Sequence, residues 1–495
     1  MSRRPQHRYV CQNCGAVWPK WSGRCEACGE WNTIVEEAPE ARAASNLPAA
    51  AGGRGGGGRI TFHGLDGNAA PPPRVETGIA ELDRVLGGGL VPGSAVLVGG
   101  DPGIGKSTLM LQAASALARN GRSVLYISGE EAVDQIRMRG QRLGLPAAGT
   151  AEAAPAGRGK RKAAAEPEPA ASVGGGLELA AAINVADIAA ALEARSDVSL
   201  VVIDSIQTMW LETVESAPGS VSQVRSSGFE LIRLAKARGF ALILVGHVTK
   251  EGALAGPRVL EHMVDAVMYF EGDRGHQFRI LRAAKNRFGA TDEIGVFAMT
   301  DRGLAEVANP SALFLAERRG NIAGSAVFAG LEGTRPVLLE VQALLSPNSG
   351  SQARRSVVGW DTGRLNMLLA VLEVRCGLKL SGMDVYLNIA GGLKVTEPAA
   401  DLAVAAALAS AATGQPTAAS AVYFGEVGLS GEVRQVTQAD ARLKEAQKLG
   451  FERVTLPRRV SRGNARLSAP DGVVLDEIGH LSDLTASFGS AAEAE

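Results

Sequence analysis

The sequence predicts an α/β protein in three parts: a small N-terminal metal ribbon, a core built on a parallel sheet, and a C-terminal α+β domain. Three observations favour this division. Four of the five cysteines lie within the first 28 of the 495 residues. From about Val75 to Val307, short apolar runs alternate with segments of helical spacing, which is typical of a parallel sheet covered by helices. After Asn309 and Pro310, strands and helices mix in another order.

Composition and charge exclude several classes of protein. Lys plus Arg number 51 and Asp plus Glu 52, a net charge of −1, so binding of a polyanion would need local patches. A content of 46% hydrophobic and 21% charged residues excludes a wholly disordered chain, and the glycines follow no collagen-like period. No run of about 18 apolar residues occurs, and no apolar segment follows the basic N-terminus. We therefore expect a cytoplasmic protein without a membrane partner.

The first cysteines, Cys11, Cys14, Cys25 and Cys28, have the spacing C-x2-C-x10-C-x2-C. Each pair can point two thiolates inward from a tight turn, and two such turns complete a tetrahedral shell suited to Zn²⁺. With four thiolates the zinc would be structural. A redox pair or ordinary buried cysteines remain the alternative, although a redox motif needs only one pair. Residues 1–34 are assigned to this ribbon, whose basic and aromatic side chains could face nucleic acid, a protein or solvent.

Low-complexity sequence marks the remaining boundaries. Residues 35–72 are rich in Ala, Gly and Pro and lack apolar periodicity, which predicts a flexible linker. The core domain is expected over 73–308. A polar stretch at about 147–176 interrupts it and is too poor in apolar residues to pack, so we expect a disordered surface insertion. The second domain is expected over 309–490.

A phosphate-binding loop follows the first strand expected in the core. Residues 96–98 form a short apolar run, and the next residues match G-x-x-x-x-G-K-[ST] before a helical segment. The glycines let backbone N–H groups converge on phosphates, and the helix N-terminus adds partial positive charge. We expect Lys106 to bridge the β- and γ-phosphates of ATP and Ser107 to ligate Mg²⁺. The expected ATP-binding residues are Gly100, Asp101, Pro102, Gly103, Ile104, Gly105, Lys106, Ser107 and Thr108.

Two further strand ends carry acidic residues. Asp204 closes the apolar run LVVID and would complete the Mg²⁺ site, as the acid of a Walker B segment does. Glu130 and Glu131 follow the run VLYISG, and a carboxylate there could act as the catalytic base that polarises water. We favour Glu130 over Glu131. The alternative for both is the ordinary enrichment of acids near a helix N-terminus.

Five segments resemble the core of the RecA-like ATPases: TGIAELDRVLGGGL, GGDPGIGKST, YISGEE, VVIDSIQT and VGHVTKEG. KNRFG at 285–289 resembles the signature of the bacterial RadA (Sms) family of DNA repair and recombination proteins. The ribbon, ATPase core and C-terminal domain occur in the order of that family, and the insertion departs from its pattern without touching a motif. The resemblance implies a helicase-like ATP hydrolase that moves on single-stranded DNA and processes branched recombination intermediates, with the recombinase RecA as a partner.

The resemblance also implies roles for single residues. His247 falls where RecA-like proteins place a polar residue that senses the γ-phosphate, and the following loop, with Lys250, would touch DNA. Lys285 and Arg287 resemble the cations that such assemblies insert into the nucleotide site of a neighbouring subunit, so a homo-oligomer is expected, and the resemblance implies a hexameric ring. The alternatives are a structural histidine and two solvated charges on a turn.

Two C-terminal segments, AGGLKVTEPAADLAVAAALASA and YFGEVGLSGEVRQVTQADARLKEA, resemble the protease domain of Lon, which uses a Ser–Lys dyad. Ala399 stands at the serine position and Asp440 at the lysine position, so we expect a ring-building domain without proteolytic activity. Basic residues gather between Arg442 and Arg466, and we expect Arg458 and Arg459 to meet the DNA backbone. An ordinary solvated face is the alternative.

Two other functions remain open on the sequence alone. A RecA-like regulatory ATPase would switch protein partners without translocation, and its hydrolysis would not respond to DNA. An ATP-dependent protease is disfavoured by Ala399 and Asp440, because neither side chain can perform the chemistry of the dyad.

Overall fold

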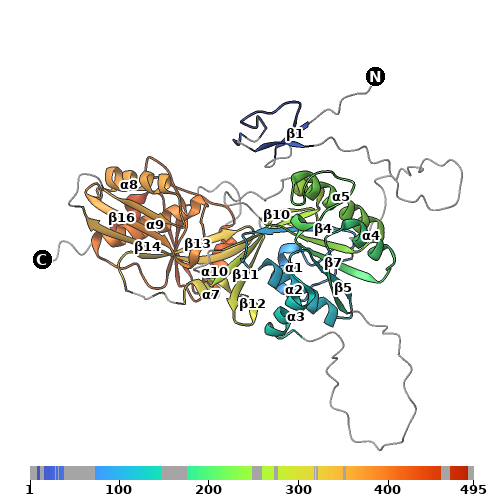
Figure 1. Ribbon diagram of the computed structural model, residues 1–495. Coiled ribbons are helices and arrows are strands. Elements are labelled where there is room, and N and C mark those ends of the chain that lie inside the picture. The colour runs from blue at the N-terminus through green and yellow to red at the C-terminus, as the bar shows by residue number, and fades with distance from the viewer. Residues whose placement is uncertain are drawn as a thin grey trace, which may run out of the picture. The chain divides into compact units, whose positions relative to one another are not determined.

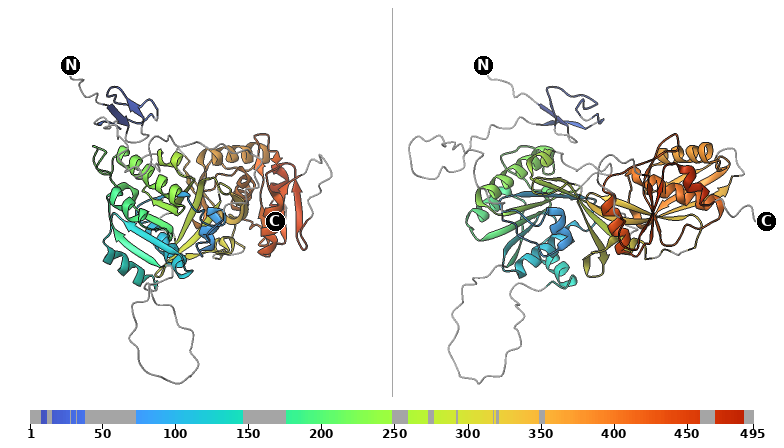
Figure 2. Two further views of the ribbon diagram at one scale, coloured as in Figure 1. Left: turned by 90° about the vertical axis from the view of Figure 1, so that its right-hand side faces the viewer. Right: turned by 180° about the vertical axis from the view of Figure 1, so that it is seen from behind.

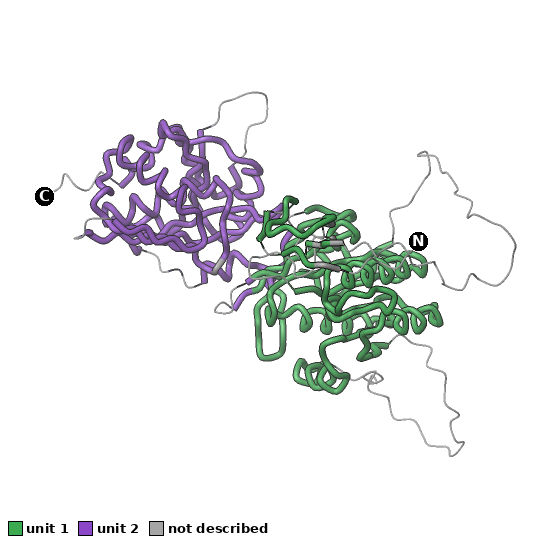
Figure 3. Tube along the Cα trace, turned by 45° about the horizontal axis from the view of Figure 1, so that its top comes forward, with its two compact units in different colours: residues 1–271, 279–291, 297–306 green, residues 272–278, 292–296, 307–495 purple. Residues whose placement is uncertain are grey.

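The computed structural model divides the chain into two units, coloured separately in Figure 3. The first unit comprises residues 1–271, 279–291 and 297–306, and the second comprises 272–278, 292–296 and 307–495. The structure describes residues 8–11, 16–27, 29–31, 33–37, 73–145, 176–247, 259–272, 277–291, 293–316, 318, 321–348, 353–458 and 469–488.

Three short antiparallel strands form the N-terminal ribbon, in the order β2-β1-β3. They are β1 Arg8–Cys11, β2 Val17–Trp18 and β3 Ile34–Glu37. Cys11, Cys25 and Ile34 are buried together as its small core. Because β3 runs to Glu37, the ribbon continues past the predicted boundary at 34. The rest of the predicted linker lies outside the described residues.

A nine-stranded sheet organises the ATPase core, in the order β12-β11-β10-β9-β4-β8-β7-β5-β6 (Figure 1). The six strands from β9 to β6 run parallel, whereas β9 pairs with β10 and β11 with β12 in antiparallel fashion. The strands are β4 Ala95–Gly100, β5 Ser123–Ser128, β6 Leu177–Ala181, β7 Val198–Asp204, β8 Ala241–Val245, β9 Ala266–Glu271, β10 Phe278–Asn286, β11 Ile294–Thr300 and β12 Gly303–Glu306. The predicted parallel sheet is confirmed.

Helices cover both faces of this sheet, as the two views of Figure 2 show. One apolar cluster joins the sheet to α1 Ala80–Leu86, α2 Lys106–Arg119 and α3 Val133–Arg142. The other joins it to α4 Val185–Glu193, α5 Val221–Arg238 and α6 Val259–Met263. Burial on both faces explains why the central strands are nearly continuous apolar runs rather than alternating ones.

The parallel arrangement brings the ends of four strands to one edge of the sheet. The phosphate loop follows β4, the two acids follow β5, Asp204 ends β7, and His247 follows β8. Ligands of open parallel sheets bind at this carboxyl edge, so the topology assembles a site from residues far apart in sequence. The predicted insertion at 147–176 falls between α3 and β6, almost wholly outside the described residues.

The second unit is built on a seven-stranded mixed sheet in the order β15-β16-β14-β13-β17-β20-β21. Its strands are β13 Ser325–Glu332, β14 Arg335–Pro347, β15 Arg355–Val358, β16 Met383–Ile389, β17 Ala421–Tyr423, β20 Arg453–Pro457 and β21 Val474–Ile478. A two-stranded ribbon, β18 Glu426–Val427 and β19 Val433–Arg434, adds to it.

Five helices accompany that sheet. They are α7 Pro310–Phe314, α8 Thr362–Cys376, α9 Asp401–Thr413, α10 Ala439–Lys448 and α11 Leu481–Ala486. Helix α9 is buried on all sides over its first ten residues, which explains its nearly uniform Ala and Leu composition. Within the described ranges, no helix has the combined length and apolar character that crossing a bilayer requires.

Candidate ATPase site and family

The phosphate loop joins β4 to α2 and depends on glycine. Gly100 has φ +153°, and a Cβ there would lie 2.5 Å from the carbonyl oxygen of Phe270. Gly105 has φ +116° and directly precedes α2. These two glycines thus let the backbone turn closely before α2, at a helix N-terminus whose N–H groups can meet an anion.

Lys106 is held within the curve of this loop. Its Nζ donates to the carbonyl oxygens of Gly100 at 2.6 Å and Asp101 at 2.9 Å. Burial lowers the pKa of Lys106 to about 8, against the opposing effect of the carboxylates of Asp204, Asp101 and Glu130. A desolvated ammonium at this point is well placed to exchange backbone carbonyls for phosphate oxygens.

His247 connects Lys106 to Glu130. The Nδ1 atom of His247 lies 3.3 Å from Lys106 Nζ, and its Nε2 atom lies 3.0 Å from Glu130 Oε1. Because the ammonium can only donate, Nδ1 accepts and Nε2 carries the proton that is donated to Glu130. The hydroxyl of Ser205 donates to the same carboxylate oxygen. The hydrogen bond from His247 is the main cause that lowers the pKa of Glu130 to about 2.

The two adjacent acids have different surroundings. Glu131 forms an ion pair with Arg139 on α3, whereas Glu130 faces His247. The backbone N–H groups of both donate to the Ser128 hydroxyl, which fixes the turn after β5. The geometry therefore favours Glu130 as the catalytic candidate, and Glu131 serves the packing of α3.

Oxygen donors suited to Mg²⁺ stand beside the loop. Ser107 is the second residue of α2, and Asp204 ends β7 as a 6% exposed residue. Hydroxyl and carboxylate oxygens match the ligand preference of this hard cation, so these two residues would hold it. Sequence reasoning missed Tyr126 on β5, whose Oη donates to Asp204 Oδ2 at 2.5 Å. Burial, together with the charge of Asp204, raises the pKa of Tyr126 well above its ordinary value.

Lys285 and Arg287 contact residues of their own chain at the end of the sheet opposite to the phosphate loop. Lys285 Nζ donates to the carbonyl oxygens of Glu261 at 2.7 Å and Val264 at 2.8 Å. Arg287 Nη1 lies 3.3 Å from Asp265 Oδ1.

That edge is fixed by a backbone contact. The other carboxylate oxygen of Asp265 accepts from the N–H of Ala95, the first residue of β4. The phosphate loop starts at the far end of this strand, about 16 Å away at the usual rise per residue. The structure therefore does not bring Lys285 and Arg287 to the nucleotide site of their own chain.

The ribbon retains part of its predicted metal site within the described residues. Cys11 and Cys25 are both fully buried, and Cys11 Sγ lies 3.2 Å from Thr33 Oγ1. Cys14 and Cys28 lie outside the described residues. Cys11 ends β1 and lies in the same small core as Cys25, so the two buried thiols fit half of the four-thiolate set expected for Zn²⁺.

The C-terminal unit corrects one expectation. Arg442 was expected in a basic surface, but its side chain is fully buried and paired with Glu397. It also donates to the carbonyl oxygen of Ala329 at 2.6 Å and stacks over Phe424 at 5.6 Å. Arg442 lies on the inner face of α10 with Leu443 and Ala446, so it belongs to the core.

The C-terminal unit also holds the predicted DNA contact Arg458 and the two positions that correspond to the Lon dyad. Arg458 is 66% exposed at the end of β20, with Asp483 at 4.0 Å, while Arg459 and Lys250 lie outside the described residues. Ala399 is 1% exposed, and Asp440 is exposed in the first turn of α10. Neither offers a nucleophile or a neutral amine.

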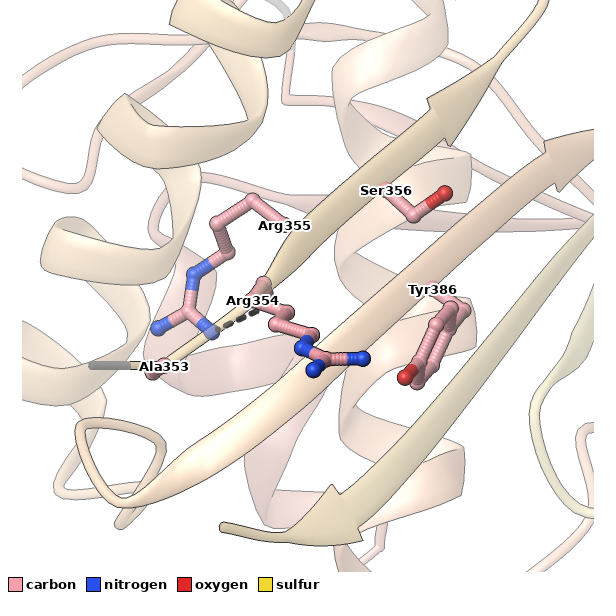
Figure 4. Close-up of a pocket in the computed structure, with 5 residues that line it drawn as sticks. All are labelled: Ala353, Arg354, Arg355, Ser356 and Tyr386. Carbon is pink, nitrogen blue, oxygen red and sulfur yellow. Dashed lines mark hydrogen bonds between the residues drawn. The ribbon is translucent and has the colours of Figure 1, made fainter. Parts of the chain in front are cut away.

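A hollow of about 590 Å³ lies on strands β15 and β16 of the same unit (Figure 4). Arg354, Arg355, Ser356 and Tyr386 line it together with Ala353. Arg355 donates to the carbonyl oxygens of Arg354 and Met383, so its guanidinium is tied to the backbone. The hollow is polar and cationic, and it contains no acidic lining residue.

Comparison with known proteins agrees with this architecture. Residues 70–253 match the AAA domain family, 9–36 the rubredoxin metal binding domain, and 366–460 subunit ChlI of Mg-chelatase. The chain is 52% identical to the DNA repair protein RadA of Brucella abortus (strain 2308), over 98% of both chains. It is 48% identical to that of Rickettsia bellii (strain RML369-C), over 99% of this chain and 100% of the relative. It is 46% identical to the DNA repair protein RadA of Bacillus subtilis (strain 168), over 91% of this chain and 92% of the relative.

These relatives cover the ribbon, the nucleotide site and the C-terminal unit alike. The match to the AAA domain family and the phosphate loop at the carboxyl edge of a parallel sheet identify a P-loop ATP hydrolase. At about half identity over nearly its whole length, the chain belongs to the family of the DNA repair protein RadA.

Proposed function

We propose that this protein is a DNA-dependent ATPase motor of recombination and repair, which moves on single-stranded DNA and extends heteroduplex at branched intermediates. The observation that carries the proposal is the hydrogen-bonded line from Lys106 through His247 to Glu130. It links the phosphate loop and the acid to the residues that follow β8, shortly before Lys250 in the sequence. A change at the nucleotide phosphates can thus be transmitted through His247 to the segment with Lys250, which is proposed to contact DNA.

The same line suggests how hydrolysis is timed. In the free site, His247 donates to Glu130 and holds its pKa at about 2, which makes Glu130 a weak base. Binding of ATP would draw Lys106 and His247 toward the γ-phosphate. Loss of the bond from His247 raises the pKa of Glu130 toward its ordinary value, and the carboxylate can then accept a proton from the attacking water.

Lys285 and Arg287 are proposed to act on a neighbouring subunit. Their partners lie at the edge of the sheet opposite to the phosphate loop, so a role in hydrolysis requires a second copy of the chain. An Arg or Lys supplied in this way stabilises the charge of the transferring phosphoryl group. We propose a homo-oligomeric ring, a hexamer by family resemblance, in which the Lon-like C-terminal unit helps subunits assemble.

DNA would be held by several cationic surfaces. The exposed Arg458, Arg459 beside it and Lys250 are the proposed contacts, and the cationic hollow at Arg354 offers a further one. Such surfaces bind the phosphate backbone without reading bases. We also propose that the ribbon holds a structural Zn²⁺ and that the core binds ATP with Mg²⁺. The protein is proposed to act in the cytoplasm with RecA as its partner.

A matched pair of variants tests the proposal. Glu130→Gln should lower kcat about 10²- to 10⁴-fold while ATP binding is retained, as expected for loss of a general base. Glu131→Gln loses only the ion pair with Arg139 and should keep most of its turnover. The unmodified protein should hydrolyse ATP faster with single-stranded DNA and should extend heteroduplex at a synthetic branch. Hydrolysis that ignores DNA would favour a regulatory switch instead.

A further inference from the structure

Tyr126 is a buried phenol on the metal side of the nucleotide site. It lies on β5, is fully buried, and its Oη donates to Asp204 Oδ2 at 2.5 Å. We propose that Tyr126 is a positioning residue that fixes the Asp204 carboxylate for Mg²⁺. The inference deepens the proposed ATPase site and rests on Ser107 and Asp204 serving there.

The pairing of β5 with β7 places the phenol. Tyr126 lies opposite Val202, and Ser128 lies opposite Asp204. Tyr126 and Val202 belong to the apolar cluster that contains α2, the helix that carries the phosphate loop residues at its start. Side chains two residues apart on a strand share a face, so Asp204 points to the same side as Val202. The long tyrosine side chain reaches from this cluster to the next position along β7.

The contact gives the two oxygens of the Asp204 carboxylate different partners. Oδ2 accepts the hydrogen bond from the phenol, and the other oxygen is then left to face the metal. The Ser107 hydroxyl also interacts with the Tyr126 oxygen, so one phenol borders both proposed metal ligands. Without it, the carboxylate would have to be oriented by the metal itself, and more Mg²⁺ would be needed to fill the site.

Tyr126→Phe removes this contact and keeps the ring in the core. The test is a Mg²⁺ titration of the binding of a fluorescent ADP analogue to the full-length protein. We expect the half-saturating Mg²⁺ concentration to rise about tenfold, the effect of losing one hydrogen bond to a charged group. Binding of the analogue without Mg²⁺ should be unchanged, and ATP turnover should recover at high Mg²⁺. An unchanged half-saturating concentration would overturn the inference.

Tyr269→Phe is the matched control in the same unit. It also loses a bond from a tyrosine to a carboxylate, Tyr269 Oη to Glu261 Oε1 at 2.8 Å, and should keep the parent's Mg²⁺ dependence. A second test separates the proposed role of Tyr126 from a general loss of stability in Tyr126→Phe. On an Asp204→Asn background, the tyrosine substitution should cause no further change in Mg²⁺ dependence, and an additive change would show that Tyr126 does not act through Asp204.

Failure of the proposed site itself would give another result. If Ser107→Ala kept the parent's Mg²⁺ dependence, the assignment of the metal site would be wrong, whatever Tyr126→Phe did. If Ser107→Ala changed the half-saturating Mg²⁺ concentration and Tyr126→Phe left it unchanged, the site would stand and the positioning role would fall.

Discussion

Replacing Arg442 with Met tests whether this cation belongs to the core of the C-terminal unit or to a DNA-binding surface. The side chain is fully buried, pairs with Glu397, and donates to the carbonyl oxygens of Ala329 at 2.6 Å and Thr437 at 3.2 Å. Removing one partner of a buried pair typically costs about 3–5 kcal/mol, because the other partner stays desolvated. Glu397 is 23% exposed and regains some water, so we expect about 3 kcal/mol.

The assay is urea unfolding of the full chain, followed by tryptophan fluorescence, to which the buried Trp360 contributes, and by circular dichroism. Arg453→Met, at a side chain 54% exposed, is the control and should change the free energy of unfolding by less than about 0.5 kcal/mol. DNA affinity of folded Arg442→Met should keep the parent's salt dependence. A loss of stability below about 1 kcal/mol, with a reduced salt slope, would refute the core assignment and make Arg442 a phosphate contact.

Three further predictions concern the nucleotide loop and the ribbon. Because the pKa of Lys106 is about 8, nucleotide affinity measured by fluorescent ADP should fall as pH rises above 8, where the free lysine loses its charge, and Lys106→Arg should abolish this dependence. Gly100→Ala would place a Cβ 2.5 Å from the carbonyl oxygen of Phe270 and should reduce ADP affinity at least about tenfold. The Cβ of Gly103→Ala meets no atom within 4 Å, so this variant should lose less ADP affinity. Equal losses of affinity in the two variants would contradict this account. Metal analysis should find zinc in the parent and none in Cys25→Ser, and an unchanged zinc content in the variant would exclude the four-thiolate site.

The sequence indicates a nucleotide loop because the parts of that loop are set by local rules. The glycines of the loop, the strand before it and the helix after it form one motif, and parallel strands bring Asp204 and His247 to the same edge. The sequence favours Glu130 over Glu131 without giving a physical reason, whereas the structure distinguishes the two acids by the ion pair of Glu131 with Arg139 in the next helix.

Two residues show what the sequence could not give. Tyr126 looks like an ordinary apolar strand residue, and only the pairing of β5 with β7 brings its hydroxyl to Asp204. Arg442 was counted as a surface charge because composition ignores helical phase. Its spacing to Ala446, four residues on, places it on the buried face of α10, and this periodicity could have indicated its burial.

The central claim is that ATP is bound by one subunit and hydrolysed with the help of another. Lys106→Ala removes the loop lysine, and Lys285→Ala removes the cation at the far edge of the sheet, so each variant alone should hydrolyse ATP poorly with single-stranded DNA. Mixed together, they should regain turnover, since some interfaces combine an intact loop with an intact Lys285. A mixture that stays as inactive as its components, or full activity of Lys285→Ala alone, would contradict the account.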